Sequence, residues 1–234
     1  MLGSIIQPNY IPWIGYFEII KYVDKFIFLD DVQYTKRDWR NRNYVRFKNN
    51  KKVLTIPVKT KKKYYQKINE TIIFDKEEFI KTHLRIFEDY YSKSKYFYEI
   101  YNFLKKTYYK SKTDILSDNT INITKDIAKY LGIEAQFKNS SSLKIQNTSS
   151  ERILEICKRE NISNYLTGKK ALSYLNLKSF QKNNINIYII SYQKQKKYKQ
   201  IQRDFIEKLS IVDLLFNCGQ SSSEYLQDVK IEKI

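Results

Sequence analysis

The sequence predicts one α/β domain in which a mostly parallel, Rossmann-like sheet is flanked by helices. A small antiparallel β-hairpin insertion and a helical middle segment complete this prediction. Short apolar strand patterns alternate with amphipathic helix patterns at both ends of the chain, which is typical of a parallel sheet covered on both faces. Residues 1–234 contain no stretch that reads as a linker, and this length supports one substantial core.

The chain begins with a strand–helix–strand unit. Apolar residues predict strands at 2–7 and 25–29, with a helix at 13–23 between them. The handedness rule makes such a unit a right-handed parallel crossover. Strand patterns at 44–47 and 53–58 flank Asn49-Asn50 and predict the hairpin, and residues 71–74 are a candidate third strand for it.

The middle of the chain is predominantly helical. Asp75 is the expected N-cap of a helix at 76–90, with Glu78 at the capping-box position. Gly132 is the expected C-cap of a later helix, and Ser149 or Ser150 caps another. Further helices are predicted at 94–109, 123–131, 175–182, 201–209 and 211–216, the last closed by a glycine, and further strands at 135–137, 165–166 and 185–190.

The chain carries a formal net charge of +18, which favours an anionic partner such as phosphate, a nucleotide, nucleic acid or a membrane face. The chain is also rich in Lys, Ile, Asn and Tyr together, which an AT-rich genome produces without selection for binding. The positive charge can therefore reflect either an anionic partner or this genome bias. Four arginines fall within residues 37–46. Because Arg suits carboxylate and phosphate better than Lys does, this cluster points to an anion site.

Nothing in the sequence indicates export or membrane insertion. No basic N-terminal region precedes a long apolar stretch, and no apolar run approaches the roughly 20 residues that a membrane span needs. Cys157 and Cys218 lie far apart and His83 is the single histidine, which argues against a zinc site and excludes a disulfide framework. We therefore expect a cytoplasmic protein with no metal ligands.

The turn after the first strand is a candidate ligand site. Pro12 stands at the start of the helix, where its missing N–H costs nothing, and Gly15 implies a close packing partner. A helix N-terminus at the end of a strand is a natural anion site. A rigid turn closed by aromatic side chains is the alternative. The residues expected to bind substrate in this turn are Gln7, Asn9, Tyr10 and Trp13.

The segment 30–43 follows the second strand and combines carboxylates, arginines and aromatic rings. Asp30 and Asp31 are candidate catalytic bases, since carboxylates at a strand end can accept protons. Arginines can grip a diphosphate, and aromatic rings can stack on a base or a sugar. A purely structural network of ion pairs is the alternative. The substrate-binding candidates here are Tyr34, Arg37, Trp39, Arg40, Arg42 and Asn43.

Two weaker candidates lie elsewhere in the chain. His83 falls on a predicted helix, where a lone histidine is usually structural, but its ordinary pKa would suit a catalytic base. Gly168 and Lys169 follow a short strand and precede a helix, so that backbone amides could approach an anion there. The spacing of a Walker A loop is absent.

These residues together resemble the WbqC-like protein family. The pattern Q-P-x-Y-x-P-W-x-G-Y-F occupies residues 7–17, D-D-V-Q-Y occupies 30–34, and a W-x-N-R-N-like block occupies 39–43. The strand ending at 54–58, His83 and the segments 90–97, 165–175 and 209–219 also fit. The family's loop after residue 165 is usually richer in glycine, whereas this chain has Lys170 and Leu172 there.

The resemblance implies a bacterial enzyme of surface-polysaccharide biosynthesis, such as O-antigen or capsule, that tailors a nucleotide-linked sugar. Our first hypothesis is a transferase that acylates or aminoacylates a nucleotide-linked amino sugar. The arginines would hold the diphosphate, Asp30, Asp31 or His83 would accept the amine proton, and Gln7, Asn9 and Asn43 would orient the sugar or the acyl carbonyl. The expected cofactor is an acyl or aminoacyl donor such as acyl-CoA, or else ATP, and the sequence fixes none of them.

Two other functions stay open. The opening strand–turn–helix–strand unit is analogous to that of HUP-type nucleotidyl transferases, although both histidines of their H-x-G-H turn are absent here. This analogy would make the protein an ATP-dependent adenylating enzyme. A basic nucleic-acid-binding module would suit the Lys- and Tyr-rich residues 59–67, but no recognised motif supports it. A homodimer is compatible with all three hypotheses.

Overall fold

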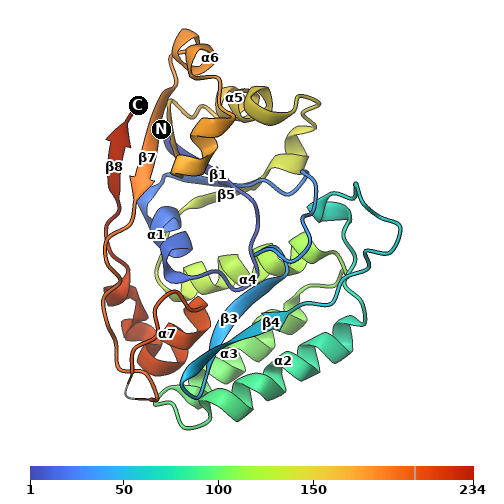
Figure 1. Ribbon diagram of the computed structural model, residues 1–234, viewed down its shortest axis with the longest axis vertical. Coiled ribbons are helices and arrows are strands. Elements are labelled where there is room, and N and C mark those ends of the chain that lie inside the picture. Colours follow the sequence, from blue (N-terminus) through green and yellow to red (C-terminus); the bar gives the residue numbers. More distant parts are fainter. Residues whose placement is uncertain (203) are drawn as a thin grey trace.

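The fold is α/β, as the sequence predicts, and it is described here from a computed structural model that covers residues 1–202 and 204–234. A mostly parallel sheet flanked by helices stands beside a two-stranded antiparallel hairpin (Figure 1). The strands are β1 (Leu2–Ile6), β2 (Lys25–Phe28), β3 (Arg42–Phe47), β4 (Asn50–Thr55), β5 (Gln136–Asn139), β6 (Asn164–Thr167), β7 (Asn186–Ser191) and β8 (Lys230–Lys233).

The α-helices lie between these strands. They are α1 (Ile14–Tyr22), α2 (Lys76–Tyr91), α3 (Phe97–Lys110), α4 (Leu116–Tyr130), α5 (Ser149–Arg159), α6 (Leu177–Lys182) and α7 (Ile211–Cys218). Short 3-10 helices are η1 (Ile68–Glu70), η2 (Ser140–Leu143), η3 (Lys169–Ser173) and η4 (Gly219–Tyr225). No helix among the described residues has both the length and the apolar character that crossing a bilayer requires.

The strand order of the main sheet is β5-β2-β1-β6-β7-β8. The pairs from β5 to β7 are parallel, and β8 joins the edge of β7 in the antiparallel direction. From β1 the chain first adds strands on one side, β2 and β5, and then on the other side, β6 and β7. The direction therefore reverses between β1 and β6, which is the arrangement of a doubly wound, Rossmann-like sheet.

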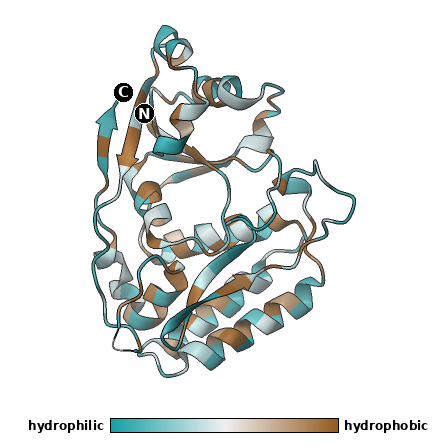
Figure 2. Cartoon of the chain, viewed as in Figure 1, coloured by the Kyte–Doolittle hydropathy of each residue, from teal (hydrophilic) through white to brown (hydrophobic). Residues whose placement is uncertain are grey.

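Alternating side chains of the strands face two separate cores. In β2, Ile27 joins a cluster with Ile153 and Ile156 of α5, whereas Phe26 and Phe28 join the larger cluster on the opposite face. This alternation is the two-residue period of a strand. In Figure 2, β7 is mostly hydrophobic, whereas β8, at the edge of the sheet, is mostly hydrophilic.

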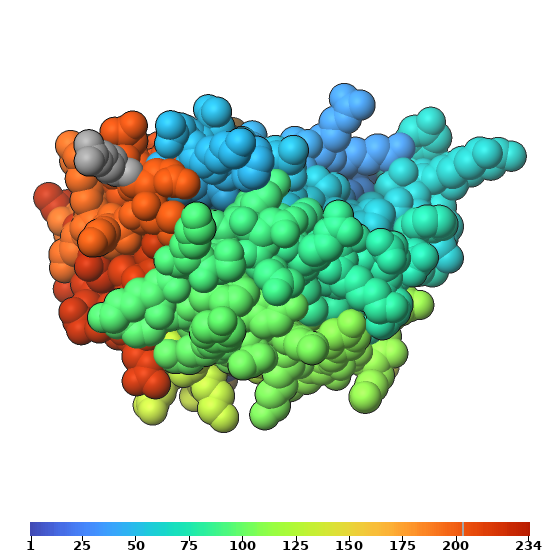
Figure 3. Space-filling model, turned by 90° about the horizontal axis from the view of Figure 1, so that it is seen from below, coloured from blue at the N-terminus to red at the C-terminus, as the bar shows by residue number. Residues whose placement is uncertain are grey.

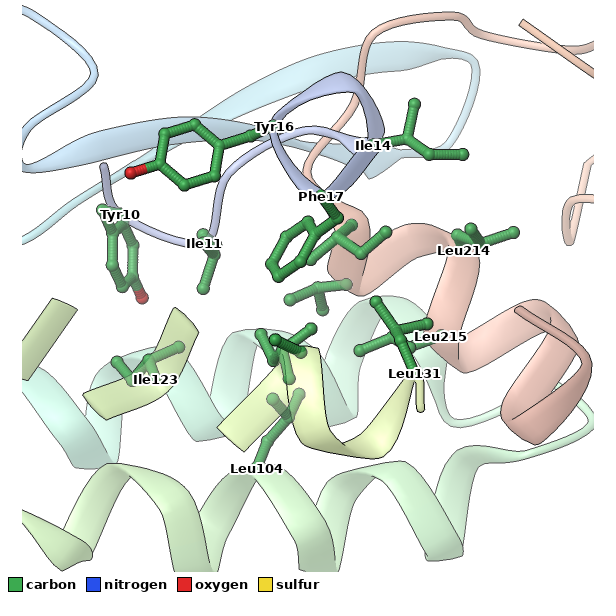
Figure 4. Packing of buried hydrophobic residues seen from close by; sticks show 14 of the residues in the cluster. Tyr10, Ile11, Ile14, Tyr16, Phe17, Leu104, Ile123, Leu131, Leu214 and Leu215 are labelled. Carbon is green, nitrogen blue, oxygen red and sulfur yellow. The ribbon is translucent and has the colours of Figure 1, made fainter. Parts of the chain in front are cut away.

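The larger core fixes the turn after β1 and helix α1 in place. Ile11 and Phe17 are fully buried and point toward helices α4 and α7 (Figure 4). The residues around them include Leu104 of α3, Ile123 of α4 and Leu215 of α7. Burying one such side chain stabilises the fold by roughly 1.5–3 kcal/mol. The middle helices thus form the platform on which the N-terminal turn lies.

The helix ends follow the sequence in part. The Asp75 carboxylate accepts the N–H of Glu78 at 3.1 Å, and Gly132 and Gly219 adopt positive φ angles just after α4 and α7, as predicted. The predicted cap at Ser149 or Ser150 is wrong, because the N-cap of α5 is Thr148, which makes no side-chain capping bond. Helix α4 also begins at Leu116, earlier than its apolar pattern suggested.

Two other element predictions need correction, and one strand was missed. Residues 71–74 form only isolated bridges, Val58↔Ile73 and Ile72↔Ile115, instead of a third hairpin strand. The described residues of the segment 201–209 form no helix. The C-terminal strand β8 was not predicted at all. Figure 3 shows residues near position 200, in orange, beside the hairpin, in blue.

Candidate functional site

The reversal point of the sheet lies between the carboxyl ends of β1 and β6. Ser4 of β1 is level with Leu166 of β6, so Gln7 and Gly168 come just beyond the ends of adjacent strands. In open α/β sheets, ligands bind in the crevice at this point. The turn of residues 7–13 begins there and carries Asn9 and Trp13.

This turn contacts the segment of residues 39–44, as the sequence hypothesis required. The backbone N–H of Tyr10 donates to the carbonyl of Trp39 at 2.9 Å. The amide of Asn43 donates to the carbonyls of Tyr10 and Ile11 at 3.1 and 3.0 Å. The Arg40 guanidinium donates to the side-chain oxygen of Asn9. Backbone and side-chain bonds therefore join the two segments into one unit.

Ile11 makes this turn strained. Its φ angle is +34°, a region that β-branched residues rarely adopt, and its side chain is fully buried. Such strain persists only where the surroundings over-determine the backbone, and it concentrates at functional sites. Here the two hydrogen bonds that Asn43 donates to backbone carbonyls and the buried packing of Ile11 hold the backbone in this conformation.

Gly15 allows Trp13 to fold back over helix α1. A Cβ atom at Gly15 would collide with the Trp13 indole and would lie 2.8 Å from the ring of Tyr192. The Trp13 and Tyr192 rings meet edge to face, with their centroids 4.9 Å apart. This aromatic pair is therefore the close packing partner expected beside Gly15. Because Tyr192 directly follows β7, the pair also joins the end of β7 to the turn.

A cavity of about 290 Å³ opens where the turn, the hairpin and the C-terminal segment meet. Its walls combine indole rings, a phenol ring, amides and ammonium groups, and no described residue contributes a carboxylate to them. Its lining residues are Asn9, Trp13, Trp39, Asn43, Tyr44, Lys51 and Lys208. The volume lies just below the usual range of about 300–1,000 Å³ for small-molecule sites. Of the residues predicted to bind substrate, it brings together Asn9, Trp13, Trp39 and Asn43.

Sequence reasoning missed three residues of the cavity: Tyr44, Lys51 and Lys208. Lys51 comes from β4, and its ammonium group lies 5.9 Å from the centre of the Tyr44 ring. Lys208 is brought in because the N–H of Ser210 donates to the carbonyl of Tyr44 at 2.7 Å. Lys51 and Lys208 lie far apart in the sequence and share no motif, so nothing in the sequence indicated that both line the cavity.

The clustered arginines do not line the cavity. Arg40 is largely buried and lies 3.4 Å from the Asp38 carboxylate, and burial lowers the pKa of Arg40 although Asp38 opposes this effect. Burial would raise the pKa of Asp38, but the charge of Arg40 and several hydrogen bonds bring it below its usual value. Arg42 donates to the carbonyl of the exposed Arg37. Arg40 therefore shapes the turn by holding Asn9.

Asp30 and Asp31 lie at the end of β2 in a polar network of their own. Asp30 is buried and accepts hydrogen bonds from the N–H and hydroxyl of Ser141 at 2.9 and 2.7 Å, and from the Ser140 hydroxyl at 3.1 Å. Asp31 pairs with Arg152 of α5 and also accepts from Ser140. These partners come from η2 and α5, and neither aspartate lines the cavity.

His83 is buried under the turn instead of facing the cavity. Its Nδ1 atom lies 2.6 Å from the Tyr10 hydroxyl, which in turn lies 2.5 Å from the hydroxyl of Tyr108. Burial lowers the pKa of His83 to about 4, although a hydrogen bond to the backbone of Thr55 opposes this shift. The ring is therefore neutral at neutral pH and connects the turn, the hairpin and helices α2 and α3.

The remaining candidates lie around the site without entering the cavity. The carbonyl of Gln7 accepts the Tyr16 hydroxyl at 3.1 Å, and the N–H of Tyr34 donates to the carbonyl of Gln66 at 2.9 Å. Gly168 and Lys169 are exposed at the end of β6. Among the described residues, no group of three or more His, Cys, Asp and Glu side chains could hold a metal ion.

The WbqC-like protein family model matches residues 7–225, which is nearly the whole chain and includes both segments of the site. The chain belongs to the WbqC-like family. It is 38% identical over 224 residues to an uncharacterized protein of Mycobacterium tuberculosis (strain ATCC 25618 / H37Rv), Rv1507c, and the match covers 96% of each chain. No solved structure matches the chain. The family motifs thus coincide with the turn and the segment that build the cavity.

Proposed function

We propose that this WbqC-like protein is a transferase of bacterial surface-polysaccharide biosynthesis that acylates or aminoacylates a nucleotide-linked amino sugar. The observation that carries the proposal is the cavity at the end of β1, which combines two indole rings, two amides and two ammonium groups. Indole rings stack on bases and sugar faces, and ammonium groups attract phosphates. A nucleotide-linked sugar offers all of these partners.

The geometry suggests a division of roles. Trp13 and Trp39 would contact the base or the sugar ring, and Lys51 and Lys208 would neutralise the diphosphate. Asn9 would orient the sugar, because Arg40 holds its side-chain oxygen and leaves its amide N–H groups to donate. The roles of Arg37, Arg42, Gln7, Tyr34, Gly168 and Lys169 in substrate binding stay predictions.

In the transfer step, the amine nitrogen attacks the carbonyl carbon of an activated acyl donor. A C–N bond forms, the bond from that carbon to the leaving group breaks, and the amine proton passes to a base. Asp30, Asp31 and His83 stay the predicted bases. Their internal partners mean that any of them would need to exchange a hydrogen bond before it could accept this proton.

Intrinsic fluorescence tests the binding step directly. The chain has two tryptophans, Trp13 and Trp39, and both line the cavity. Titration with nucleotide-linked amino sugars is expected to change this fluorescence saturably and to raise the melting temperature by mass action. The variant Trp39→Phe should keep binding but give a smaller fluorescence change. Lys208→Ala should weaken binding. Lys61→Ala, on a loop that does not line the cavity, should leave binding unchanged.

Turnover needs a second measurement. With the ligand bound, an acyl-CoA or another activated donor should give a product heavier by the acyl group in mass spectrometry. Ala variants of Asp30, Asp31 and His83 are each expected to keep binding, and the true base should lose turnover. If all three variants keep full turnover, the assignment of the base is wrong. If no nucleotide-linked sugar binds saturably, the substrate class is wrong.

An ATP-dependent adenylating enzyme is the second candidate. The reversal of strand order between β1 and β6 is also where HUP-type nucleotidyl transferases bind their nucleotide, and this is an analogy of fold alone. Release of pyrophosphate from ATP, dependent on an added carboxylic acid, would favour this function. Transfer from a preformed acyl-CoA without ATP would favour the first.

A further inference from the structure

Among the described residues, strand β8 has a strand partner on one side only, so one edge of the main sheet is free. It pairs antiparallel with β7 on one side and is the last strand of the sheet. Figure 1 shows it at the rim of the molecule. Among the described residues, no hydrogen bond outside the β7–β8 ladder reaches the backbone of Ile231 or Lys233. A free edge of this kind is a template for another strand.

The ladder determines which backbone groups of β8 point outward. The N–H of Ile234 donates to the carbonyl of Ile187 at 3.0 Å, so the backbone groups of Ile234 point toward β7. These groups alternate along an antiparallel strand. Those of Glu232 therefore also point toward β7, whereas those of Ile231 and Lys233 point outward. A further strand can bond to β8 only through these two residues.

We propose that two copies of this chain pair antiparallel through β8, related by a two-fold axis at Ile231. The two Ile231 residues would then exchange both N–H···O=C bonds. Lys230 of each copy would lie opposite Glu232 of the other, in the non-hydrogen-bonded positions where side chains approach most closely. The two-fold axis makes this ion pair occur twice.

The charge pattern of β8 selects this register. When two copies of the sequence Lys230-Ile231-Glu232 pair antiparallel about Ile231, each lysine lies opposite a glutamate of the other copy. An axis at Lys233 would place two ammonium groups side by side, and an axis at Glu232 would place two carboxylates opposite each other. Like charges directly opposite each other destabilise a strand pair. Lys230 and Glu232 are both exposed, so they are accessible to a second copy.

Apolar surface at the same edge supports the pairing. Leu177 of α6 and Ile234 are 40% and 52% exposed, and they line a groove of about 480 Å³ together with Lys233. A strand added along β8 would run past this groove. Because a four-residue strand buries little area by itself, this apolar rim is the additional surface that a stable dimer would cover.

Charge reversal with rescue tests the register. Sedimentation velocity over a range of protein concentrations should show a monomer–dimer equilibrium in buffer with 0.15 M salt, which screens the repulsion between two chains of charge +18. Glu232→Lys and Lys230→Glu should each raise the dimer dissociation constant about tenfold or more, because two opposite-charge pairs become like-charge pairs. The double variant K230E/E232K should restore the wild-type value.

Hydrogen exchange supplies an independent readout. The amides of residues 229–234 should become more protected as the protein concentration rises, and this change should vanish in Glu232→Lys. Unchanged far-ultraviolet circular dichroism would show that each variant is folded. A wild-type chain that is monomeric at every concentration overturns the proposal. So does a dimer that neither single reversal weakens, or one that the double variant fails to restore.

Discussion

Asn43 is the residue on which the shape of the candidate site depends most directly. Its amide group holds two successive carbonyls, those of Tyr10 and Ile11, and its side-chain oxygen accepts the N–H of Tyr44 at 2.8 Å. It thereby fixes the strained backbone at Ile11 and forms part of the cavity wall. One buried side chain thus connects hairpin geometry to the position of Asn9 and Trp13.

Asn43→Ala is expected to lower the free energy of unfolding by about 2–3 kcal/mol. The change removes the bonds to two buried carbonyls, and each lost hydrogen bond in a buried place costs roughly 1 kcal/mol or more. Urea denaturation followed by circular dichroism measures this loss. Asn49→Ala, in the exposed hairpin turn, is the matched control and should change stability by less than about 0.5 kcal/mol. Equal effects of the two changes would contradict the role given to Asn43.

His83 gives the protein a specific dependence of stability on pH. Burial holds its pKa at about 4 in the folded chain, well below the ordinary value of 6.5. The unfolded chain therefore binds a proton at higher pH than the folded chain does. The stability that comes from the neutral ring is fully present above pH 6.5 and is lost as the pH falls toward 4.

The expected contribution is on the order of 3 kcal/mol between pH 6.5 and pH 4. Carboxylates with lowered pKa values, such as Asp38 and Glu160, also lose stability in acid, so the wild type must be compared with a variant. In His83→Gln the difference between the free energies of unfolding at these two pH values should shrink by this amount. The same slope in both proteins would show that His83 does not titrate in this range.

At the scale of elements, a buried polar network holds the segments 192–202 and 204–209, in which the described residues form no helix or strand. The Gln200 side chain accepts the N–H of Ile206 at 2.9 Å and donates to the Ile206 carbonyl at 3.1 Å and to the Asp213 carboxylate at 2.9 Å. Asp213 also accepts the hydroxyl groups of Tyr91 and Tyr198. The network joins this segment to α7, α2 and, through Arg46, the hairpin.

Gln200→Ala is expected to loosen this segment without unfolding the sheet. The change leaves the backbone of Ile206 and part of Asp213 without partners, and a buried polar group without a partner costs about 1–3 kcal/mol. Hydrogen exchange should rise at least tenfold in residues 194–208, while α4 stays protected. Lys199→Ala, the exposed neighbour, is the control. Uniform loss of protection in both regions would mean that the network supports the whole fold.

The same segment explains which elements the sequence could predict. β1, β2 and α1 were predicted correctly because their apolar residues repeat with the period of the element and become buried. The helix at 201–209 was wrong because Gln200 satisfies the backbone of Ile206 across the segment, a contact that no periodicity reveals. β8 was missed because Lys-Ile-Glu-Lys is polar and becomes a strand only through its pairing with β7.

The candidate site was predictable for similar reasons. The motif residues Asn9, Trp13, Trp39 and Asn43 stand at strand ends or beside them, where parallel sheets gather ligand residues. Lys51 and Lys208 reach the cavity only through tertiary packing. The arginine cluster was recognised as important, but Arg40 and Arg46 proved to be bonded to protein groups. The residue types in the sequence therefore indicated where the site lies, but they did not show which groups each charged side chain contacts.

At the scale of the whole molecule, the positive charge is distributed unevenly. Residues 39–69 contain 11 Lys and Arg residues and none of the 25 Asp and Glu residues. A bias toward Lys codons alone would not remove acidic residues from one segment. This segment includes the hairpin that walls the cavity and the exposed loop with Lys61, Lys62 and Lys63. The hairpin thus brings part of this positive charge to the candidate site, where Lys51 lines the cavity.

A field of this kind should accelerate the arrival of an anionic substrate. We expect the association rate of a nucleotide-linked sugar, followed by stopped-flow tryptophan fluorescence, to fall about tenfold between 0.05 and 0.5 M salt. The dissociation rate should change little, because steering acts on encounter and not on the bound contacts. The double variant K48E/K52E, which alters exposed lysines of the hairpin, should slow association at low salt and approach the wild type at high salt.

The matched control separates local steering from net charge. K105E/K106E changes the net charge equally but alters α3, which is remote in sequence from the segment that walls the cavity. Because a field falls off within roughly 10 Å at 0.1 M salt, distant charges should contribute less to the encounter. The hairpin variant should therefore slow association several-fold more than this control does. Equal slowing would mean that total charge alone attracts the ligand, and the uneven distribution would then have no role in substrate capture.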